Sequence, residues 1–220
     1  MKWGFHMAKK KNRKGNKIVL LDLIFYVAIP YVLWTYGREP VGDYGAMLIS
    51  TIPGFVYTCY RFILEKQFNI TGLFILGSLM LGTVVDLISG SAEQMLWNGV
   101  YVSLFYVVIH LIAMLIKRPF ALYFAVDFAY LQGYAHKSSK ALFTRQGIFK
   151  WFQFIQAIFI LRGLCMSALT VFLLNQYGVD GYSDMLIYKR ALGWTFGLMI
   201  MGLYVYVNIP IQKFLNHTAY

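Results

Sequence analysis

Long apolar stretches alternate with short polar segments along the whole chain. Each stretch has about 20 residues, the length that a helix needs to cross a hydrocarbon core about 30 Å thick. Their apolar residues cover all sides of a helix, whereas the outer helices of a soluble bundle keep one polar face. The pattern predicts an all-α, polytopic membrane protein with one transmembrane domain at 18–210. Its six transmembrane helices are predicted at residues 18–36, 43–64, 70–89, 95–116, 151–174 and 185–209.

The segment KRPFALYFAVDFAYLQGY, residues 117–134, follows the fourth span and has a different pattern. Pro119 suits the first turn of a new helix, where a missing N–H costs nothing. Helical spacing then separates two faces, with Phe120, Phe124, Phe128 and Leu131 on one and Tyr123, Asp127, Tyr130 and Tyr134 on the other. We expect an amphipathic helix at about 119–134 in the cytoplasmic interface, with its phenylalanines in lipid. The alternative is a re-entrant hairpin packed against the bundle, which would bury Asp127.

Lysine and arginine lie mostly on one side of the predicted spans. With the N-terminus in the cytoplasm, all 20 fall on the cytoplasmic side except Arg38, Arg162, Lys189 and Arg190. Cytoplasmic loops carry such an excess of basic residues. The bias predicts a cytoplasmic tail at 1–17, a basic linker at 135–150 and a cytoplasmic tail at 211–220. Anionic lipids on that face are the expected partners.

The composition agrees with a membrane protein, because 59% of the residues are hydrophobic and only 13% are charged. The net charge of +11 is explained by orientation and lipid contacts, so nucleic acid is not an expected partner. Cys59 and Cys165 lie inside predicted spans without metal-ligand spacing, and neither a disulfide nor a metal site is expected. The first apolar run is longer than the core of a signal peptide. We expect it to stay uncleaved, with translation starting at Met1 or Met7.

Small residues recur at helical spacing in two spans, at Ala46, Ser50 and Gly54 and at Gly193 and Gly197. Helices in lipid associate through such residues, so these are predicted packing faces. The second spacing is also compatible with a homo-oligomer. Pro30 and Pro53 are expected to be tolerated kinks, with unwound binding segments as the alternative.

Several ionisable residues fall inside the predicted spans, where a charge costs at least about 2.5–3.5 kcal/mol on insertion scales. Helical rise sorts them into an outer layer of Asp86, Lys189, Arg190 and Arg162 and an inner layer of Asp22 and His110. We expect Asp86 to pair with Lys189 or Arg190, and Asp22 to pair with His110. One interpretation is a polar path in which Arg162 selects an anion. The other is that ion pairs hold the bundle together, with Lys189 and Arg190 extending to the interface.

No hydrolytic or nucleotide-binding motif is present, and the four histidines lie at unrelated positions. Neither an enzyme nor a cofactor is expected.

Four short motifs are distinctive: YRF at 60–62, KRPF at 117–120, YKRALGW at 188–194 and YVYVNIP at 204–210. Their order resembles the intracellular septation protein A family, and more closely its six-helix relatives. The resemblance implies a bacterial inner-membrane protein with division or elongation proteins as partners. It marks Lys117, Arg118, Pro119 and Lys189 as motif positions. The longer basic N-terminus and the 135–150 linker differ from the family pattern.

Two functions follow as hypotheses. The first is a non-enzymatic envelope protein that acts through partners or lipid contacts, using its basic inner face and the 117–134 helix. The alternative is a small transporter or channel for an ion or small solute, with a polar path around Arg162. Apolar neighbours and a single carboxylate around Arg162 would favour the first.

Overall fold

The computed structural model describes residues 20–64, 69–131 and 134–217. Over these ranges the chain is helical apart from short turns and contains no strand, so the predicted all-α class is confirmed for them. Four stretches are long and apolar enough to cross a membrane, namely Leu20–Leu64, Ile70–Leu87, Ala92–Leu115 and Gly147–Ile209. They indicate a membrane protein. The predicted tail at 1–17 lies outside the described ranges.

The first stretch reverses direction at Gly42, inside the helix α2 (Ile29–Leu64). Gly42 has a φ of 72°, which glycine adopts without strain because it has no Cβ. The flanking residues form two antiparallel arms, a first arm at 20–41 and a second arm at 43–64. Between the arms, the hydroxyl oxygens of Tyr26 and Thr58 lie 2.5 Å apart.

A single π-helical turn, η1 (Ile24–Ala28), lies in the first arm directly before Pro30. In a regular α-helix the ring of Pro30 would clash with the carbonyl group of Tyr26, and the wider π turn accommodates it. Pro53 lies inside a continuous helix. Neither proline therefore unwinds its helix.

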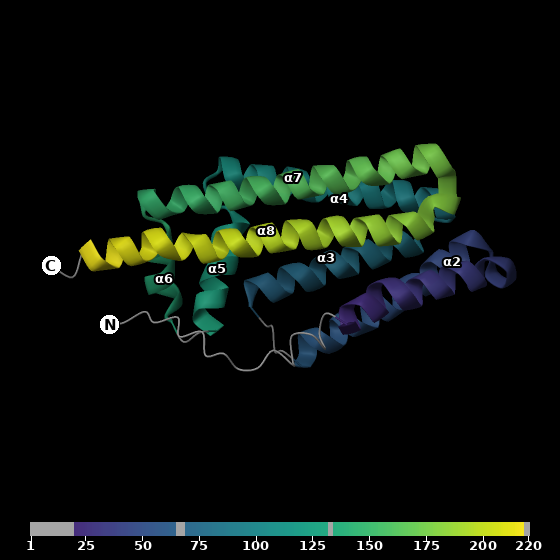
Figure 1. The fold of residues 1–220 in the computed structure, drawn as a ribbon, viewed down its shortest axis with the longest axis horizontal. Coiled ribbons are helices and arrows are strands. Elements are labelled where there is room, and N and C mark those ends of the chain that lie inside the picture. The colour runs from purple at the N-terminus through teal and green to yellow at the C-terminus, as the bar shows by residue number, and fades with distance from the viewer. Residues whose placement is uncertain (1–19, 65–68, 132–133, 218–220) are drawn as a thin grey trace.

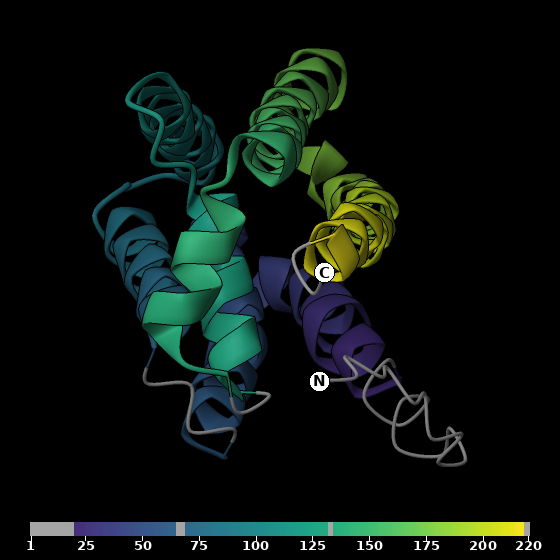
Figure 2. The ribbon, with the colours of Figure 1, turned by 90° about the vertical axis from the view of Figure 1, so that its left-hand side faces the viewer.

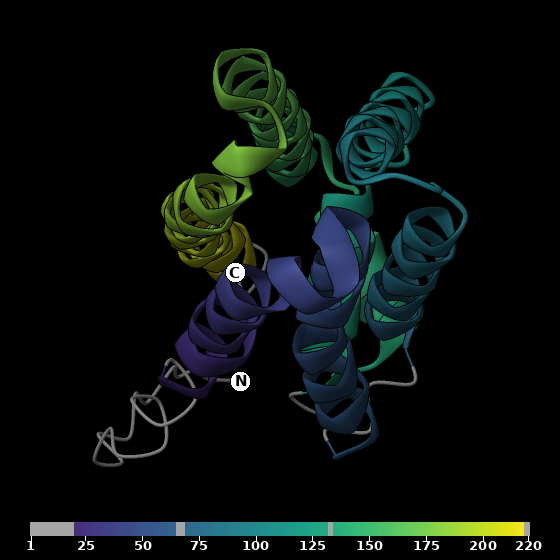
Figure 3. The same cartoon turned by 90° about the vertical axis from the view of Figure 1, so that its right-hand side faces the viewer.

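The last stretch also reverses, at the 3-10 helix η2 (Gly178–Gly181), which joins α7 (Gln146–Tyr177) to α8 (Tyr182–His217). These two helices lie side by side in Figure 1. Viewed from either end, they form a ring with the two arms of α2 and with α3 (Ile70–Leu87) and α4 (Ala92–Leu115), as Figures 2 and 3 show.

The small residues of the second arm pack as predicted, because Ala46, Ser50 and Gly54 are all buried. A Cβ on Gly54 would lie 3.0 Å from the Tyr26 ring. In α8 a Cβ on Gly193 would lie 3.5 Å from Met166, but Gly197 is exposed with nothing within 4 Å. Within this single chain α8 turns the neighbours Phe196 and Ile200 inward instead, so packing through Gly197 stays a prediction.

Two short helices, α5 (Phe120–Leu131) and α6 (His136–Phe143), cross one end of the ring, transverse to the long helices (Figures 1 and 2). The predicted linker at 135–150 is largely helical, because it contains α6 and the start of α7. Ser139 and Phe143 are buried and anchor α6. Similarly, α8 continues to His217, so 211–217 belongs to that helix and 218–220 lies outside the described ranges.

The long helices exceed what a membrane crossing requires. α7 has 32 residues and α8 has 36, about 48 and 54 Å at 1.5 Å per residue, against a hydrocarbon core of about 30 Å. Their extra turns share one buried apolar cluster with α5 and α6, made of Ala121, Leu122, Val126, Ala129, Phe143, Ile148, Phe152, Ile155, Ile200, Val207 and Ile211. The transverse layer is thus a packed part of the fold.

The face of α5 that points inward differs from the prediction. Phe128 is 60% exposed, but Phe120 and Phe124 contact the ring of Phe74 in α3, with centroids 5.2 and 5.7 Å apart. Asp127 is 2% exposed, as the packed alternative requires. The reason is a specific partner, because the Asp127 carboxylate accepts hydrogen bonds from the backbone N–H and the hydroxyl of Thr71, both at 2.8 Å.

Candidate functional site

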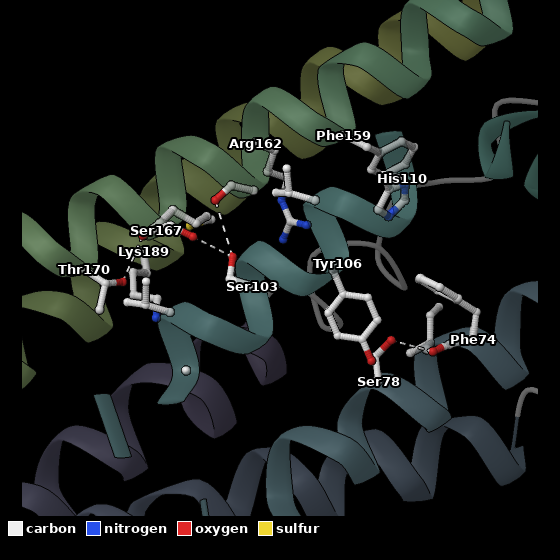
Figure 4. Close-up of a pocket in the computed structure, with 16 residues that line it drawn as sticks. Phe74, Ser78, Ser103, Tyr106, His110, Phe159, Arg162, Ser167, Thr170 and Lys189 are labelled. Atoms are coloured by element: carbon white, nitrogen blue, oxygen red, sulfur yellow. Dashed lines mark hydrogen bonds between the residues drawn. The ribbon is translucent and has the colours of Figure 1, made fainter. Parts of the chain in front are cut away.

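A cavity of about 470 Å³ lies between α3, α4, α7 and α8. Its polar lining consists of Ser78, Ser103, Tyr106, His110, Arg162, Ser167, Thr170 and Lys189. Figure 4 shows the side chains of Arg162, Ser103 and Lys189 directed into this space. The lining contains two cations and no carboxylate.

Neither cation has a partner in direct contact within the described part of the chain. Arg162 makes no hydrogen bond or ion pair there, and neither does Lys189. Both side chains are exposed to the cavity. A charge at membrane depth needs a compensating group, so the two cations make this cavity a candidate site for a negatively charged ligand.

The register of α7 and α8 sets the spacing of these cations. Gly193 of α8 lies opposite Met166 of α7, so Lys189 lies level with Thr170 in the antiparallel pair. Arg162 is eight residues from Thr170 along α7, or about 12 Å along the helix axis. The cations therefore occupy two levels of one cavity.

Hydroxyl groups lie beside these levels. The Ser167 hydroxyl donates to the oxygen of Ser103 at 2.9 Å, and the Ser103 hydroxyl donates to the Gly163 carbonyl group at 3.4 Å. Thr170 donates to the carbonyl group of Met166 at 2.9 Å. Such hydroxyls rotate and can donate to a bound anion instead.

Gly163 brings α4 and α7 together along this wall. A Cβ at Gly163 would lie 2.5 Å from Cγ2 of Val107, closer than real Cβ contacts allow. The sequence analysis missed this glycine although Ser167, a second small residue, follows it at a spacing of four. Its signal was that spacing, together with its position one residue after Arg162 in the fifth predicted span.

His110 lies at the α5 end of the cavity and is paired with Gln156 of α7. Nε2 of Gln156 is 2.8 Å from His110 Nδ1 and donates to the His110 carbonyl group at 2.9 Å. The predicted pairing of His110 with Asp22 is therefore wrong. Helical rise gave the depth of each residue but not which helices are neighbours.

Asp22 lies instead between two arginines. Its oxygens are 3.5 Å from Arg61 and 3.5 Å from Arg190, so Arg190 pairs with Asp22 and not with Asp86. Sequence analysis missed Arg61 as a partner. The sequence did hold a sign of this pair. Asp22 lies 20 residues before the reversal at Gly42 and Arg61 lies 19 residues after it, so the two reach the same level of the antiparallel arms.

Asp86 lines a second cavity of about 340 Å³ between α2, α3 and α8, together with Ser50 and Tyr182. Its charge interacts with that of Lys189, but no N–O distance between them is within 4.0 Å in the described part of the chain. The predicted ion pair of Asp86 with Lys189 is thus absent. Ser78 lines both cavities.

The remaining predicted positions lie at the α5 end. Lys117 and Arg118 are exposed in the turn between α4 and α5, and Pro119 is buried. Lys117 has a φ of 56° and closes α4 through two hydrogen bonds, from Lys117 N–H to Met114 and from Arg118 N–H to Ala113. These two bonds form a Schellman motif at the end of α4. The residue with a positive φ in such a motif, here Lys117, is usually glycine.

Fold and cavity together define an α-helical protein with several membrane-compatible helices around a cationic cavity. A scan against protein-family models found no match, and searches of curated proteins and of solved structures found none either. The resemblance to the septation family stays a prediction.

Proposed function

We propose that this chain is an integral membrane protein that binds an anionic solute in the cavity of Arg162 and Lys189 and moves it across the bilayer. One observation carries the proposal. The cavity is lined by two cations and several hydroxyls, without any carboxylate. An anion would neutralise charges that are costly at this depth.

The contrast with Asp22 supports a binding role for Arg162. Arg61 and Arg190 share the carboxylate of Asp22. A cation that serves only to hold the bundle together is expected to have such a partner. Arg162 has hydroxyls and aromatic rings around it instead. The envelope-scaffold hypothesis expected apolar neighbours and one carboxylate there, so the transporter or channel hypothesis is preferred.

The proposal includes six membrane crossings. The reversals at Gly42 and η2 divide two of the apolar stretches into antiparallel halves, and each half is long enough to cross. The asymmetry of lysine and arginine favours cytoplasmic termini and a cytoplasmic α5–α6 layer. The motif resemblance favours the bacterial inner membrane.

Proteoliposomes test this function. We expect anion flux or anion binding with the wild-type protein, in a screen of chloride, phosphate and small carboxylates. Arg162→Gln should abolish it and Lys189→Gln should weaken it, while each variant stays monodisperse. A double variant, Lys117→Gln with Arg118→Gln, keeps the cavity and should retain flux. If no anion binds, and Arg162→Gln lowers only the folded yield, the envelope-scaffold hypothesis is correct instead.

A further inference from the structure

An aromatic cup lies beside Arg162 in the cavity. Four rings line it there, those of Phe74, Tyr106, His110 and Phe159. Phe74 contacts the rings of Tyr106 and His110 edge-on at 5.8 and 5.9 Å, and His110 stacks on Phe159 at 5.5 Å. Figure 4 shows these rings at one side of Arg162, with Ser103 and Ser167 at the other.

Helix α5 closes the cup from behind. Phe120 packs on Phe74 and His110 at 5.2 and 5.3 Å, and Phe124 packs on Phe159 at 6.1 Å. Neither Phe120 nor Phe124 lines the cavity itself. The cup therefore has an apolar base and opens toward Arg162.

The cup is also held in place before any ligand arrives. Gln156 is fully buried and fixes the His110 ring by the bond to Nδ1 at 2.8 Å. The amide oxygen of Gln156 accepts a hydrogen bond from the backbone N–H of Ala121 at 3.2 Å, which links the His110 ring to α5. Preorganised apolar walls lower the cost of binding.

We infer that the ligand is an organic anion with one carboxylate or phosphate group at Arg162 and a compact aromatic or aliphatic body in the cup. This inference rests on the proposed function and narrows its substrate class. Arginine binds carboxylate and phosphate through paired N–H groups, and aromatic rings prefer an apolar or aromatic partner. The volume of about 470 Å³ lies in the range of small-molecule sites, about 300–1,000 Å³, and exceeds what a bare ion fills.

The test compares the affinities of two probes that carry the same acid group, one with an aromatic ring attached and one without. Calorimetry on the purified full chain in detergent would measure phenyl phosphate against inorganic phosphate, and benzoate against acetate. Burying one ring should give the aromatic probe an affinity at least about tenfold higher. Neutral benzyl alcohol should not bind, and Arg162→Gln should remove the binding of all four anions.

Phe159→Leu keeps an apolar side chain and should reduce the preference for the aromatic probe severalfold while leaving phosphate binding unchanged. Phe172→Leu is the matched control, because Phe172 is an exposed residue of the same helix α7 that does not line the cavity. It should leave the preference unchanged.

Three results would overturn the inference. Equal affinity for phenyl phosphate and inorganic phosphate, lost in Arg162→Gln, would support an anion site without an organic body. Absence of all binding by folded protein would refute the proposed function as well. In nanodiscs, phosphatidylglycerol could prevent phenyl phosphate from binding while phosphatidylcholine does not. That result would show that the ligand is a lipid head group.

Discussion

At the scale of single residues, Gly163 leaves no room for a larger side chain. Its Cβ position lies 2.5 Å from Val107, so Gly163→Ala must push α4 and α7 apart. Overpacking of this kind typically costs about 1–3 kcal/mol, and thermal unfolding in detergent would show the loss. Val107→Ala in the same chain should restore stability. Gly197→Ala, where nothing lies within 4 Å, is the control, and equal stability of the two single variants would refute the contact.

Sequence alone identified the residues of the cavity better than their partners. Arg162 and Lys189 stood out because charges inside apolar spans are rare, and both line the cavity. The pairs were wrong because a depth along a helix says nothing about which helix lies beside it. The sequence did not mark the hydroxyls of Ser103 and Ser167 as part of a ligand site, since serine is common at any helix interface in lipid.

At the scale of elements, α5 is fixed to α3 by Asp127. The carboxylate accepts two hydrogen bonds from Thr71, and bonds to a charged acceptor contribute about 1.5–3 kcal/mol each. Asp127→Ala should therefore lower the unfolding free energy by about 2 kcal/mol or more and expose α5 to protease. Glu39→Ala removes an exposed carboxylate from α2 and should change neither. Unchanged protease resistance in Asp127→Ala would contradict this anchoring role.

In the turn after α4, one substitution is expected to raise stability rather than lower it. Lys117 adopts a φ of 56°, which a residue with a Cβ adopts at a cost of about 1 kcal/mol. Lys117→Gly should therefore raise thermal stability, whereas Lys117→Val should lower it because a β-branched residue fits this conformation worst. A drop in stability with glycine would show that the lysine side chain itself holds the turn.

Arg38 links the two reversals of the chain. Its guanidinium lies 2.7 Å from Asp43 beside Gly42 and 2.5 Å from Asp180 in η2. The hydrogen bond to Asp43, reinforced by Asp180, raises the pKa of Arg38 above its ordinary value, so the guanidinium group stays charged at every working pH. Exposed pairs are weak. Arg38→Gln should cost no more than about 1 kcal/mol, and about 1 M salt should remove the difference from wild type.

At the scale of the whole molecule, the sequence predicted what hydrophobicity alone determines. The apolar stretches and the separate helix after Pro119 are present in the structure. The length of α7 and α8 and the existence of α6 were missed, because their outer turns pack against α5 rather than lipid. The two faces predicted for α5 are each divided in the structure. Phe120 and Phe124 pack on Phe74 while Phe128 is exposed, and Asp127 is buried by its contact with Thr71 while Tyr130 is exposed.

One measurement tests the anion cavity most directly. In a chain with Cys59→Ala and Cys165→Ala, Ser103→Cys places a single thiol beside Arg162. We expect an anionic methanethiosulfonate reagent to modify it severalfold faster than a cationic one of similar size, and Arg162→Gln to remove that preference. Equal rates for both reagents in the parent chain, or no modification of a folded protein, would show that the cavity is not a water-filled anion site.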